Sequence, residues 1–402
     1  MVYVDNLLLA ANSCPFMNEI KWQLLSKFKM KDLGPVKYIL RIEITWNWAK
    51  RTLSLSQHQY VEKILKCCGM SGCKPLETPL ALGLRLKQNT GPTISSMMIN
   101  GKCVMYTSVV GLLMYAILGM YLDLAYTVGL LGQYSSNPGA AHWATANHAL
   151  WYLQCKKDQV LTYWGKSLDS PLTFFGYSDA DWGGDNNTSR LTLGYVFMAC
   201  GSAIGWSSKR QSLVAMLSIE SEYIGLANAG IHLSWLQMFF EDVGHAQEKP
   251  TTLFCDNQSA ISVSKDLQYH SCTKHIQWKY HYIWDDVVGK KLAIIQYILT
   301  VDMVVDIFTK ALSQDKHSKF ATVMGLQPCL SRSVRIWGLY KHRLLASGAN
   351  LGLFILNSTY TSFLLLFCFS LSMAEVCMLS LQYHSSILLT TLYLYTFGLL
   401  GI

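Results

Sequence analysis

Charged residues are scarce in this sequence. Only 14% of the 402 residues are Asp, Glu, Lys or Arg, whereas hydrophobic residues make up 51% and aromatic residues 12%. This composition excludes a disordered chain, because enough apolar surface is available to form ordered cores. The length allows two or three domains. The small basic excess, 33 Lys and Arg against 25 Asp and Glu, permits a polyanionic partner without requiring one.

The sequence also lacks the common cysteine motifs and a secretory leader. Its twelve cysteines include no CxxC pair and no zinc-finger spacing, so reduced cysteines are the simpler interpretation. The first residues, MVYVDNLLLAANS, contain neither a basic leader nor a signal-length apolar run. We therefore expect an intracellular protein, located in the cytoplasm or the nucleus.

The first half of the chain combines strand-like and helical segments. MVYVDNLLLAANS is typical of a buried hairpin, and the spacing of Ile20, Leu24 and Phe28 predicts a helix after it. Because the chain starts in what resembles the middle of a sheet, we expect a truncated protein. Residues 1–80 form the first predicted domain. Residues 81–165 form a linker rich in Gly, Pro, Asn and Ser, followed by apolar helices.

Residues 166–325 follow a different pattern. Three strand-like runs, LTFFGYSDA, LGYVFMACG and SAIGWSS, precede a helix that is predicted to begin at Ser218. A strand, TTLFCD, then leads into a helix beginning at Asn257, and a last helix is predicted from about Asp302. This order of strands and helices predicts a mixed α/β domain.

Residues 326–402 form an apolar tail. The segment 351–373, LGLFILNSTYTSFLLLFCFSLSM, has no charged residue over 23 positions, which is long enough for a transmembrane helix. Ser, Thr and Asn in its middle weaken that interpretation. Residues 351–373 are thus a candidate transmembrane segment, and membrane attachment through them is one alternative for this protein.

Acidic residues cluster in the stretch GYSDADWGGD. Asp179, Asp181 and Asp185 fall within seven residues, although charged residues are scarce elsewhere. The stretch is either a solvated acidic turn or part of a metal-binding cluster. We interpret Asp181 and Asp185 as solvated turn acids, and Asp179, at the end of a predicted strand, as the metal-binding candidate.

Three further acids are predicted to lie at the same edge of the sheet as Asp179. Glu222 lies early in a predicted helix, Asp256 ends a strand and Asp306 lies near the start of the last helix. Strand ends and helix starts meet at one edge of an α/β sheet. Converging carboxylates repel one another unless divalent cations are present, and two Mg²⁺ ions can support phosphodiester hydrolysis. The alternative is that these acids are solvated or cap helices.

Several motifs, in order, resemble one family. GYSDADWGGDNNTSRLTLGYVF, AIGWSSKRQSLVAMLSIESEY, LFCDNQSAI, HSCTKHIQWKYHYI and VDIFTKAL resemble the ribonuclease H region of the Pol polyprotein of copia-type long-terminal-repeat retrotransposons. MVYVDNLLLAANS, CKPLETPL, YTSVVGLLMYA and SSNPGAAHW resemble the end of that family's reverse transcriptase and the connection after it. The resemblance covers about residues 2–320, and the tail lies outside it.

The resemblance implies an α/β fold. A ribonuclease H-like mixed sheet flanked by helices would be preceded by a partial reverse-transcriptase palm and thumb and a helical connection. The family's catalytic and metal-binding acids match Asp179 in YSDAD, Glu222 in ESEY, Asp256 in CDNQSAI and Asp306 in VDIFTK. The implied reaction is endonucleolytic hydrolysis of the RNA strand of an RNA–DNA hybrid with two Mg²⁺ or Mn²⁺ ions, leaving a 3′-hydroxyl.

Basic residues near these motifs are candidate nucleic-acid contacts. Lys209 and Arg210 follow the third strand and are expected to contact phosphates. Lys274, His275 and Lys279 alternate with aromatic residues, a pattern that favours contact by charge and stacking. The alternative is an ordinary basic helix face. The expected partners are an RNA–DNA hybrid and other parts of the retrotransposon polyprotein.

The reverse-transcriptase part departs from its family. Where the family has YVDD, this chain has Tyr3, Val4, Asp5 and Asn6, and Asn is a poorer Mg²⁺ ligand than a carboxylate. The resemblance also places the earlier catalytic Asp before Met1. We therefore expect no polymerase activity and treat Asp5 as a remnant of the polymerase site. The alternatives to an active ribonuclease are a degenerate, non-catalytic nucleic-acid-binding remnant and a tail-anchored membrane protein.

Overall fold

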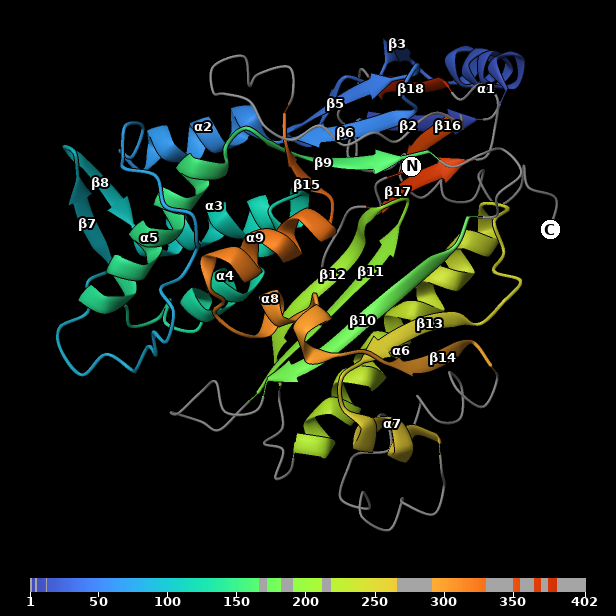
Figure 1. Ribbon diagram of the computed structural model, residues 1–402. Coiled ribbons are helices and arrows are strands. Elements are labelled where there is room, and N and C mark those ends of the chain that lie inside the picture. The colour runs from blue at the N-terminus through green and yellow to red at the C-terminus, as the bar shows by residue number, and fades with distance from the viewer. Residues whose placement is uncertain are drawn as a thin grey trace.

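The described part of the chain forms a mixed α/β structure. The computed structural model describes residues 2–3, 6–11, 13–165, 172–181, 191–211, 218–265 and 291–329, and the backbone of strands at 350–354, 365–369 and 375–381 (Figure 1). Within these residues there is one four-stranded sheet, two five-stranded sheets and two hairpins.

The N-terminal region follows the local sequence pattern. Its elements are β1 (Val2–Tyr3), β2 (Asn6–Ala11), α1 (Cys14–Lys27), β3 (Met30–Pro35), β4 (Tyr38–Ile39), β5 (Ile42–Asn47), β6 (Thr52–Ser56) and α2 (His58–Cys67). β1 and β2 pair as the predicted antiparallel hairpin. Ser13 caps α1, because its hydroxyl accepts a hydrogen bond from the N–H of Phe16 at 3.5 Å. The hairpin and the helix after it are therefore confirmed.

The tail contributes strands in place of the predicted transmembrane helix. β16 (Asn350–Phe354) and β17 (Leu365–Phe369) pair antiparallel, so the described parts of 351–373 are extended and the prediction of one helix is wrong there. The polar run NSTYTS divides this segment into two apolar pieces of strand length. No helix among the described residues has the length and apolarity required to cross a bilayer.

A third tail strand joins the N-terminal sheet. β18 (Glu375–Leu381) lies between β2 and β3 and pairs antiparallel with both, as the red arrow among blue strands shows in Figure 1. The sheet order is β1-β2-β18-β3. Strand pairing thus covers backbone edges of β2 and β3 that would otherwise be open to intermolecular pairing.

Residues 96–164 form a hairpin, a group of helices and a strand. The elements are β7 (Ser96–Ile99), β8 (Lys102–Met105), α3 (Tyr106–Gly119), the 3-10 helix η1 (Leu122–Leu124), α4 (Ala125–Gly132), α5 (Ala140–Lys156) and β9 (Gln159–Trp164). The irregular segment before β7 packs against these helices. Asn89 donates hydrogen bonds to Asn137 and to the carbonyl of Pro138, while the N–H of Ile94 donates to Pro138. The segment predicted as a linker is therefore anchored.

A mixed five-stranded sheet follows. Its region contains β10 (Phe174–Asp181), β11 (Thr192–Ala199), β12 (Ser202–Arg210), α6 (Ser218–Asp242), β13 (Thr251–Cys255), α7 (Gln258–Lys265), β14 (Ala293–Tyr297), η5 (Thr300–Asp302), α8 (Asp306–Thr309), α9 (Gln314–Val323) and β15 (Leu326–Pro328). The strand order is β12-β11-β10-β13-β14. β10, β11 and β12 are antiparallel neighbours, whereas β10, β13 and β14 are parallel.

Local sequence signals predicted the starts of two helices in this region, but they did not predict the helices after residue 300. α6 begins at Ser218, as expected, and Asn257 caps α7 by accepting a hydrogen bond from the N–H of Ala260 at 3.0 Å. The single last helix predicted from Asp302 is instead η5, α8 and α9. Lys310, directly after α8, has an extended backbone with φ −149° and ψ 161°, which ends that helix.

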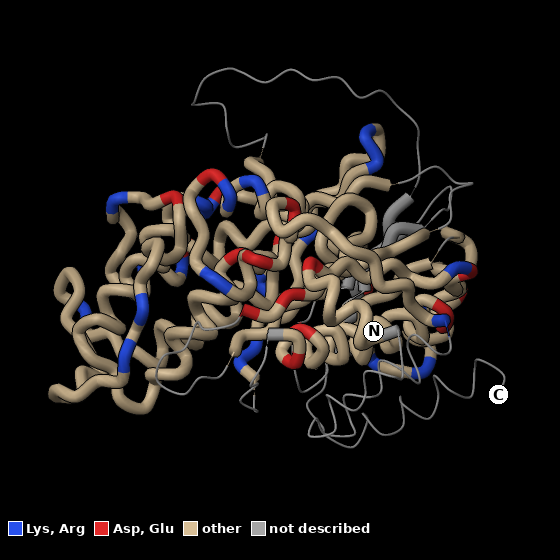
Figure 2. The backbone as a smooth tube through the Cα atoms, turned by 60° about the horizontal axis from the view of Figure 1, so that its bottom comes forward, with Lys and Arg blue, Asp and Glu red and all other residues tan. Residues whose placement is uncertain are grey.

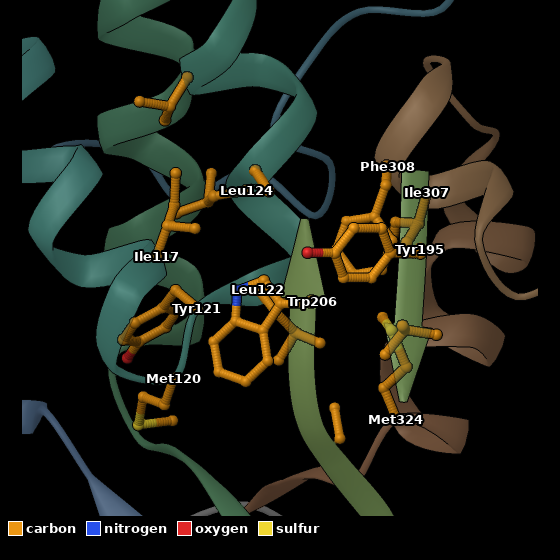
Figure 3. Close-up of a cluster of buried hydrophobic side chains, with 14 of the residues drawn as sticks. Ile117, Met120, Tyr121, Leu122, Leu124, Tyr195, Trp206, Ile307, Phe308 and Met324 are labelled. Atoms are coloured by element: carbon orange, nitrogen blue, oxygen red, sulfur yellow. The ribbon is translucent and has the colours of Figure 1, made fainter. Parts of the chain in front are cut away.

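A continuous apolar core joins this sheet to the helices before it. In Figure 3, Trp206 on β12 faces Tyr121 and Leu122, while Phe308 of α8 approaches Tyr195. These five side chains are all buried. β9 also contributes to the second five-stranded sheet, ordered β15-β9-β6-β5-β4, so strands distant in sequence belong to one sheet.

Cysteine oxidation differs from the sequence expectation at one described position. Cys200 is disulfide-bonded. The free cysteines among the described residues are Cys14, Cys67, Cys68, Cys73, Cys103, Cys155, Cys255 and Cys329. The expectation of reduced thiols is therefore wrong for Cys200.

A buried acid links η1 to two helices. Asp123 is 1% exposed, and the Tyr152 hydroxyl of α5 donates a hydrogen bond to Asp123 Oδ2. The ring of His317 of α9 forms a hydrogen bond with the Asp123 backbone. Burial raises the pKa of the Asp123 carboxyl above its ordinary value, although His317 and Tyr152 oppose this effect. These contacts connect η1 with α5 and α9.

Removing the Tyr152 hydroxyl is expected to destabilise the protein. Tyr152→Phe should lower the free energy of unfolding by about 1–3 kcal/mol, because it removes a partner of a buried carboxyl. Tyr121→Phe is the control, since it removes a hydroxyl that donates to the neutral carbonyl of Lys156 at 3.0 Å; its cost should be about 1 kcal/mol. Urea denaturation measures both, and equal costs would contradict a special role for Asp123.

Candidate active site

Two of the predicted acids lie at the ends of neighbouring parallel strands. β10 pairs with β13 through Gly176 with Leu253 and Tyr177 with Phe254. Asp179 and Asp256 each come two residues after the last of these pairs, so they occupy equivalent positions at the same end of the sheet. Asp179 is 4% exposed and Asp256 is partly buried.

The third acid comes from the first turns of α6. Glu222 is 7% exposed, and one of its oxygens accepts a hydrogen bond from the Ala180 backbone. Gly225, one turn later, allows α6 to approach β10 closely. A Cβ atom at Gly225 would lie 3.3 Å from Ser178 Oγ and 3.7 Å from Ala180 Cβ. The small residue at 225 therefore helps bring Glu222 to the strand end.

The fourth acid reaches the site on α8. The hydroxyl of Thr309 donates a hydrogen bond to Asp179 Oδ2 at 2.5 Å. Gly194, which pairs with Asp179 across β10 and β11, permits this approach. A Cβ atom at Gly194 would lie 2.7 to 2.9 Å from side-chain atoms of Val305, Phe308 and Thr309. The absence of a side chain at 194 is thus required for α8 to pack in place.

Two lysines hold Asp306. Lys310 Nζ lies 2.7 Å from Asp306 Oδ1, and Lys316 Nζ lies 2.5 Å from Asp306 Oδ2. Asp306 is fully buried. Burial alone would lower the pKa of Lys310, but the carboxylates of Asp179 and Asp306 raise it above its ordinary value. Asp306 is therefore an ion-paired carboxylate at the margin of the cluster.

The other acids are strongly perturbed. Burial raises the pKa of Asp179 to about 6, while Lys310 and the Thr309 hydroxyl oppose the shift. Burial, with repulsion from Asp179 and Asp256, raises the pKa of Glu222 to about 10. Glu222 Oε2 is buried and has no hydrogen-bond partner among the described residues. Such perturbed acids beside one another are typical of functional sites.

The donor set fits a hard divalent cation. If ionised, the four acids carry four formal negative charges and the two lysines carry two positive charges, which leaves a balance of minus two. The donors are carboxylate oxygens, which Mg²⁺ prefers, and Glu222 Oε2 is a buried oxygen with no hydrogen-bond partner in the described part of the chain. In Figure 2, several acidic positions lie in the central part of the molecule, with basic positions among them.

Cysteine also enters the site. Single ligand atoms of Glu222, Cys255 and Asp256 lie within 4.8 Å of one another. Cys255 ends β13 and is fully buried, and burial raises the pKa of its thiol above the ordinary value. The predicted site did not include Cys255, although it directly precedes Asp256 in the motif LFCDNQSAI.

The structure places only part of the predicted nucleic-acid interface. Lys209 is exposed on β12, and Arg210 Nη1 donates to Gln133 Oε1 of the residues following α4 at 2.9 Å. Arg210 pairs with Thr192, which pairs in turn with Asp181, so the basic residues lie at the same end of the sheet as the acids. The remaining predicted residues, Asp5, Asp185, Lys274, His275 and Lys279, lie outside the described residues.

Asp181 occupies an intermediate environment. It ends β10, and burial raises the pKa of its carboxyl while Lys310 opposes that shift. It is partly buried, and its predicted role as a solvated turn acid does not fit this burial.

Residues that support the acids were missed from the sequence. Thr309 and Lys310 belong to the quoted motif VDIFTKAL but received no role, and Lys316 follows it. Thr300 donates a hydrogen bond to Asp256 Oδ2 at 2.9 Å. The only available signal was the proximity of Thr309 and Lys310 to Asp306 in sequence, because their contacts with distant strands depend on packing.

Known proteins resemble this chain over most of its length. A family model described as reverse transcriptase (RNA-dependent DNA polymerase) matches residues 1–82. The retrovirus-related Pol polyprotein from transposon TNT 1-94 of Nicotiana tabacum is 35% identical over 326 residues, which are 81% of this chain and 24% of that protein. The corresponding polyprotein from transposon RE2 of Arabidopsis thaliana is 31% identical over 329 residues, 81% of this chain and 22% of that protein.

A shorter relative is matched almost completely. An uncharacterized mitochondrial protein of Arabidopsis thaliana is 36% identical over 238 residues, 58% of this chain and 92% of that protein.

The fold and these similarities define a mixed α/β protein of a retroelement. The chain belongs to the Pol polyprotein family of copia-type retrotransposons and contains a reverse-transcriptase-like domain. It spans less than a quarter of the length of the two transposon polyproteins.

Proposed function

We propose that residues 166–325 form a ribonuclease H-like domain that hydrolyses the RNA strand of RNA–DNA hybrids. The observation that carries this proposal is the burial of Asp179 and Glu222 beside Asp256 at one end of a mixed sheet. Without a cation, ionisation of either acid is unfavourable there, since burial and repulsion from neighbouring carboxylates raise both pKa values. The sheet order β12-β11-β10-β13-β14, with helices packed on it, supports the same assignment.

Asp179, Glu222 and Asp256 would hold Mg²⁺ or Mn²⁺, and Asp306 would join them as a ligand of a second ion. When bound, these ions supply the positive charge that activates water and stabilises the leaving oxygen of a phosphodiester. Thr309 holds the Asp179 carboxylate in position, and Thr300 does the same for Asp256. For Asp306 to serve as a ligand, Lys310 and Lys316 must release one of its oxygens.

The surroundings favour a polyanionic substrate. Lys209 is exposed at the same end of the sheet as the acids, where a phosphate backbone would be attracted by its charge. We propose that an RNA–DNA hybrid binds there, with its RNA strand distinguished by the 2′-hydroxyl groups. Other polyprotein segments are the proposed protein partners of this chain.

The reverse-transcriptase-like domain is proposed to be inactive as a polymerase. Its YVDD position carries Asn6 in place of the second acid, and a neutral amide is a poorer Mg²⁺ ligand than a carboxylate.

Cleavage of a labelled hybrid tests the ribonuclease assignment. The full chain is incubated with an RNA–DNA hybrid, with the same RNA as a duplex and with the same DNA as a duplex, in Mg²⁺ or in EDTA. We expect Mg²⁺-dependent cutting of the RNA strand in the hybrid only. Hybrid binding by a folded chain without cutting would instead support a non-catalytic nucleic-acid-binding protein.

Loss of the Thr309 hydroxyl is expected to weaken the site without removing a ligand. Thr309→Val keeps the side-chain shape but removes the donor to Asp179, so cleavage at low Mg²⁺ should fall by about 10- to 100-fold. Part of the loss should be recovered at higher Mg²⁺. Thr322→Val on α9 is the control, because its hydroxyl donates to the Ser318 carbonyl at 2.9 Å within the helix and its side chain is exposed. An equal Mg²⁺ requirement in both variants would exclude this role for Thr309.

A further inference from the structure

We propose that this acid cluster is also a site for a thiophilic divalent cation of the Zn²⁺ class, held by Cys255, Glu222 and Asp256, whose binding excludes Mg²⁺. One ligand atom from each of the three residues lies within 4.8 Å of the others. The inhibitory consequence rests on the proposed ribonuclease function, whereas the binding itself does not.

The geometry is close to that of a zinc site. Ligand atoms on one tetrahedral Zn²⁺ are about 3.5 Å apart, given Zn–S and Zn–O bonds of about 2.3 and 2.0 Å. The ligand atoms here lie within 4.8 Å of one another, so each pair is at most about 1.3 Å farther apart than on a bound ion. Cys255 and Asp256 are adjacent at the end of β13, and Glu222 reaches them from α6.

The site also contains an unused ligand atom. Glu222 is 7% exposed, and its Oε2 has no hydrogen-bond partner among the described residues. The Cys255 sulfur is 3.5 Å from the N–H of Asn257, which orients it at the strand end. Asp256 is only partly buried, so a cation can enter from its side. A buried carboxylate oxygen without a partner among the described residues, beside a positioned thiol, offers two ligand atoms to one cation.

The chemistry separates this cation from Mg²⁺. Thiolate is a soft ligand that favours Zn²⁺ and related ions, whereas Mg²⁺ selects oxygen donors. Binding converts the Cys255 thiol to a metal-bound thiolate and releases its proton to the solvent. Because Glu222 and Asp256 are also proposed Mg²⁺ ligands, the two kinds of cation compete for the same carboxylates.

Cadmium provides a direct measure of binding, because thiolate coordination to Cd²⁺ produces an ultraviolet charge-transfer absorption. The full chain is titrated with Cd²⁺ in the absence of Mg²⁺. In Cys255→Ser, the absorption should fall by the amount that one Cd²⁺–thiolate bond contributes. The first Cd²⁺ ion bound in the titration should also have a dissociation constant at least tenfold higher than in the wild-type protein. Cys155→Ser is the matched control, since Cys155 contacts the Glu77 carboxylate at 3.2 Å and belongs to no three-ligand cluster among the described residues. Cys255→Ala, which introduces no buried hydroxyl, gives the same comparison if the serine variant does not fold.

Inhibition is measured as a ratio within each variant. For each variant, the rate of Mg²⁺-dependent hybrid cleavage is measured with and without Zn²⁺. The Zn²⁺ concentration that halves this rate should be at least tenfold higher for Cys255→Ser than for Cys155→Ser, whatever the basal rate of each. Equal Cd²⁺ absorption and equal Zn²⁺ inhibition in the two variants would overturn the inference. Loss of Cd²⁺ binding in Cys255→Ser by a chain that cuts no hybrid would support the cation site and reject the ribonuclease function.

Discussion

Asp179→Asn is expected to abolish hybrid cleavage while stabilising the metal-free protein. Cleavage should fall by more than about 100-fold, because residues that merely support metal ligands already contribute about 10- to 100-fold. Stability should change in the opposite direction. Asp179 is 4% exposed with a pKa of about 6, so ionising it at pH 7 costs up to about 3 kcal/mol relative to an ordinary Asp. The neutral amide removes this cost.

The pH dependence of unfolding provides the check. In the folded, metal-free protein Asp179 and Glu222 have pKa values of about 6 and about 10, above their ordinary values of 3.8 and 4.5. The folded state therefore binds more protons than the unfolded state, and the free energy of unfolding should decrease as pH rises. The Asp179 contribution is lost between about pH 4 and 6, and the Glu222 contribution between about pH 4.5 and 10.

The matched control for Asp179→Asn is Asp242→Asn, an exposed acid at the end of α6. It should alter neither cleavage nor the pH dependence by a comparable amount. Addition of Mg²⁺ should raise the melting temperature of the wild-type protein at pH 7 more than that of Asp179→Asn, since the variant lacks one ligand. An active Asp179→Asn protein, or one with the wild-type pH dependence of unfolding, would reject the assignment of this residue.

Gly194→Ala is expected to lower the free energy of unfolding more than Tyr152→Phe or Tyr121→Phe. The added Cβ would lie 2.7 to 2.9 Å from side-chain atoms of Val305, Phe308 and Thr309, closer than packed atoms tolerate. Overpacking of this kind costs about 1–3 kcal/mol, and three simultaneous contacts place Gly194→Ala near the upper end. Because α8 must shift, Thr309 should move away from Asp179, and hybrid cleavage should fall as well.

The same substitution at Gly111 is the control. Gly111 lies on an exposed face of α3, and no atom of the described residues lies within 4 Å of the position of an added Cβ. Gly111→Ala should therefore stabilise the protein by about 0.5–1 kcal/mol, since alanine has a higher helix propensity. Chemical denaturation of both variants measures the difference. Equal effects at the two positions would contradict the close packing of α8 on β11.

Helix starts were predictable because short-range chemistry determines them. Asn257, the predicted start of α7, accepts a hydrogen bond from the N–H of Ala260. This contact spans three residues, so the sequence alone contains both partners. The positions of Asp179 and Asp256 were also predictable, because each lies at or near the carboxyl end of an apolar strand and parallel strands end at the same edge.

Longer apolar segments were ambiguous. Residues 351–373 met the length criterion for a transmembrane helix, yet their described parts are β16 and β17. Hydrophobicity over a window does not distinguish a helix from two strands that pair with each other. The insertion of β18 between β2 and β3 joins residues more than 300 positions apart, and no local pattern specifies such a pairing.

The sequence by itself indicated the family of this protein, the strands and helices of residues 172–265, and the four acids that are proposed as metal ligands. The tertiary structure decided how those acids are supported. Thr309 lies 130 positions from Asp179 but donates a hydrogen bond to it, and Cys255 approaches Glu222 across the space between β13 and α6. Such contacts depend on how closely helices approach the sheet, which Gly194 and Gly225 permit. Local sequence propensity depends on residues that are close along the chain, whereas the candidate site is formed by residues that are distant in sequence and close in space.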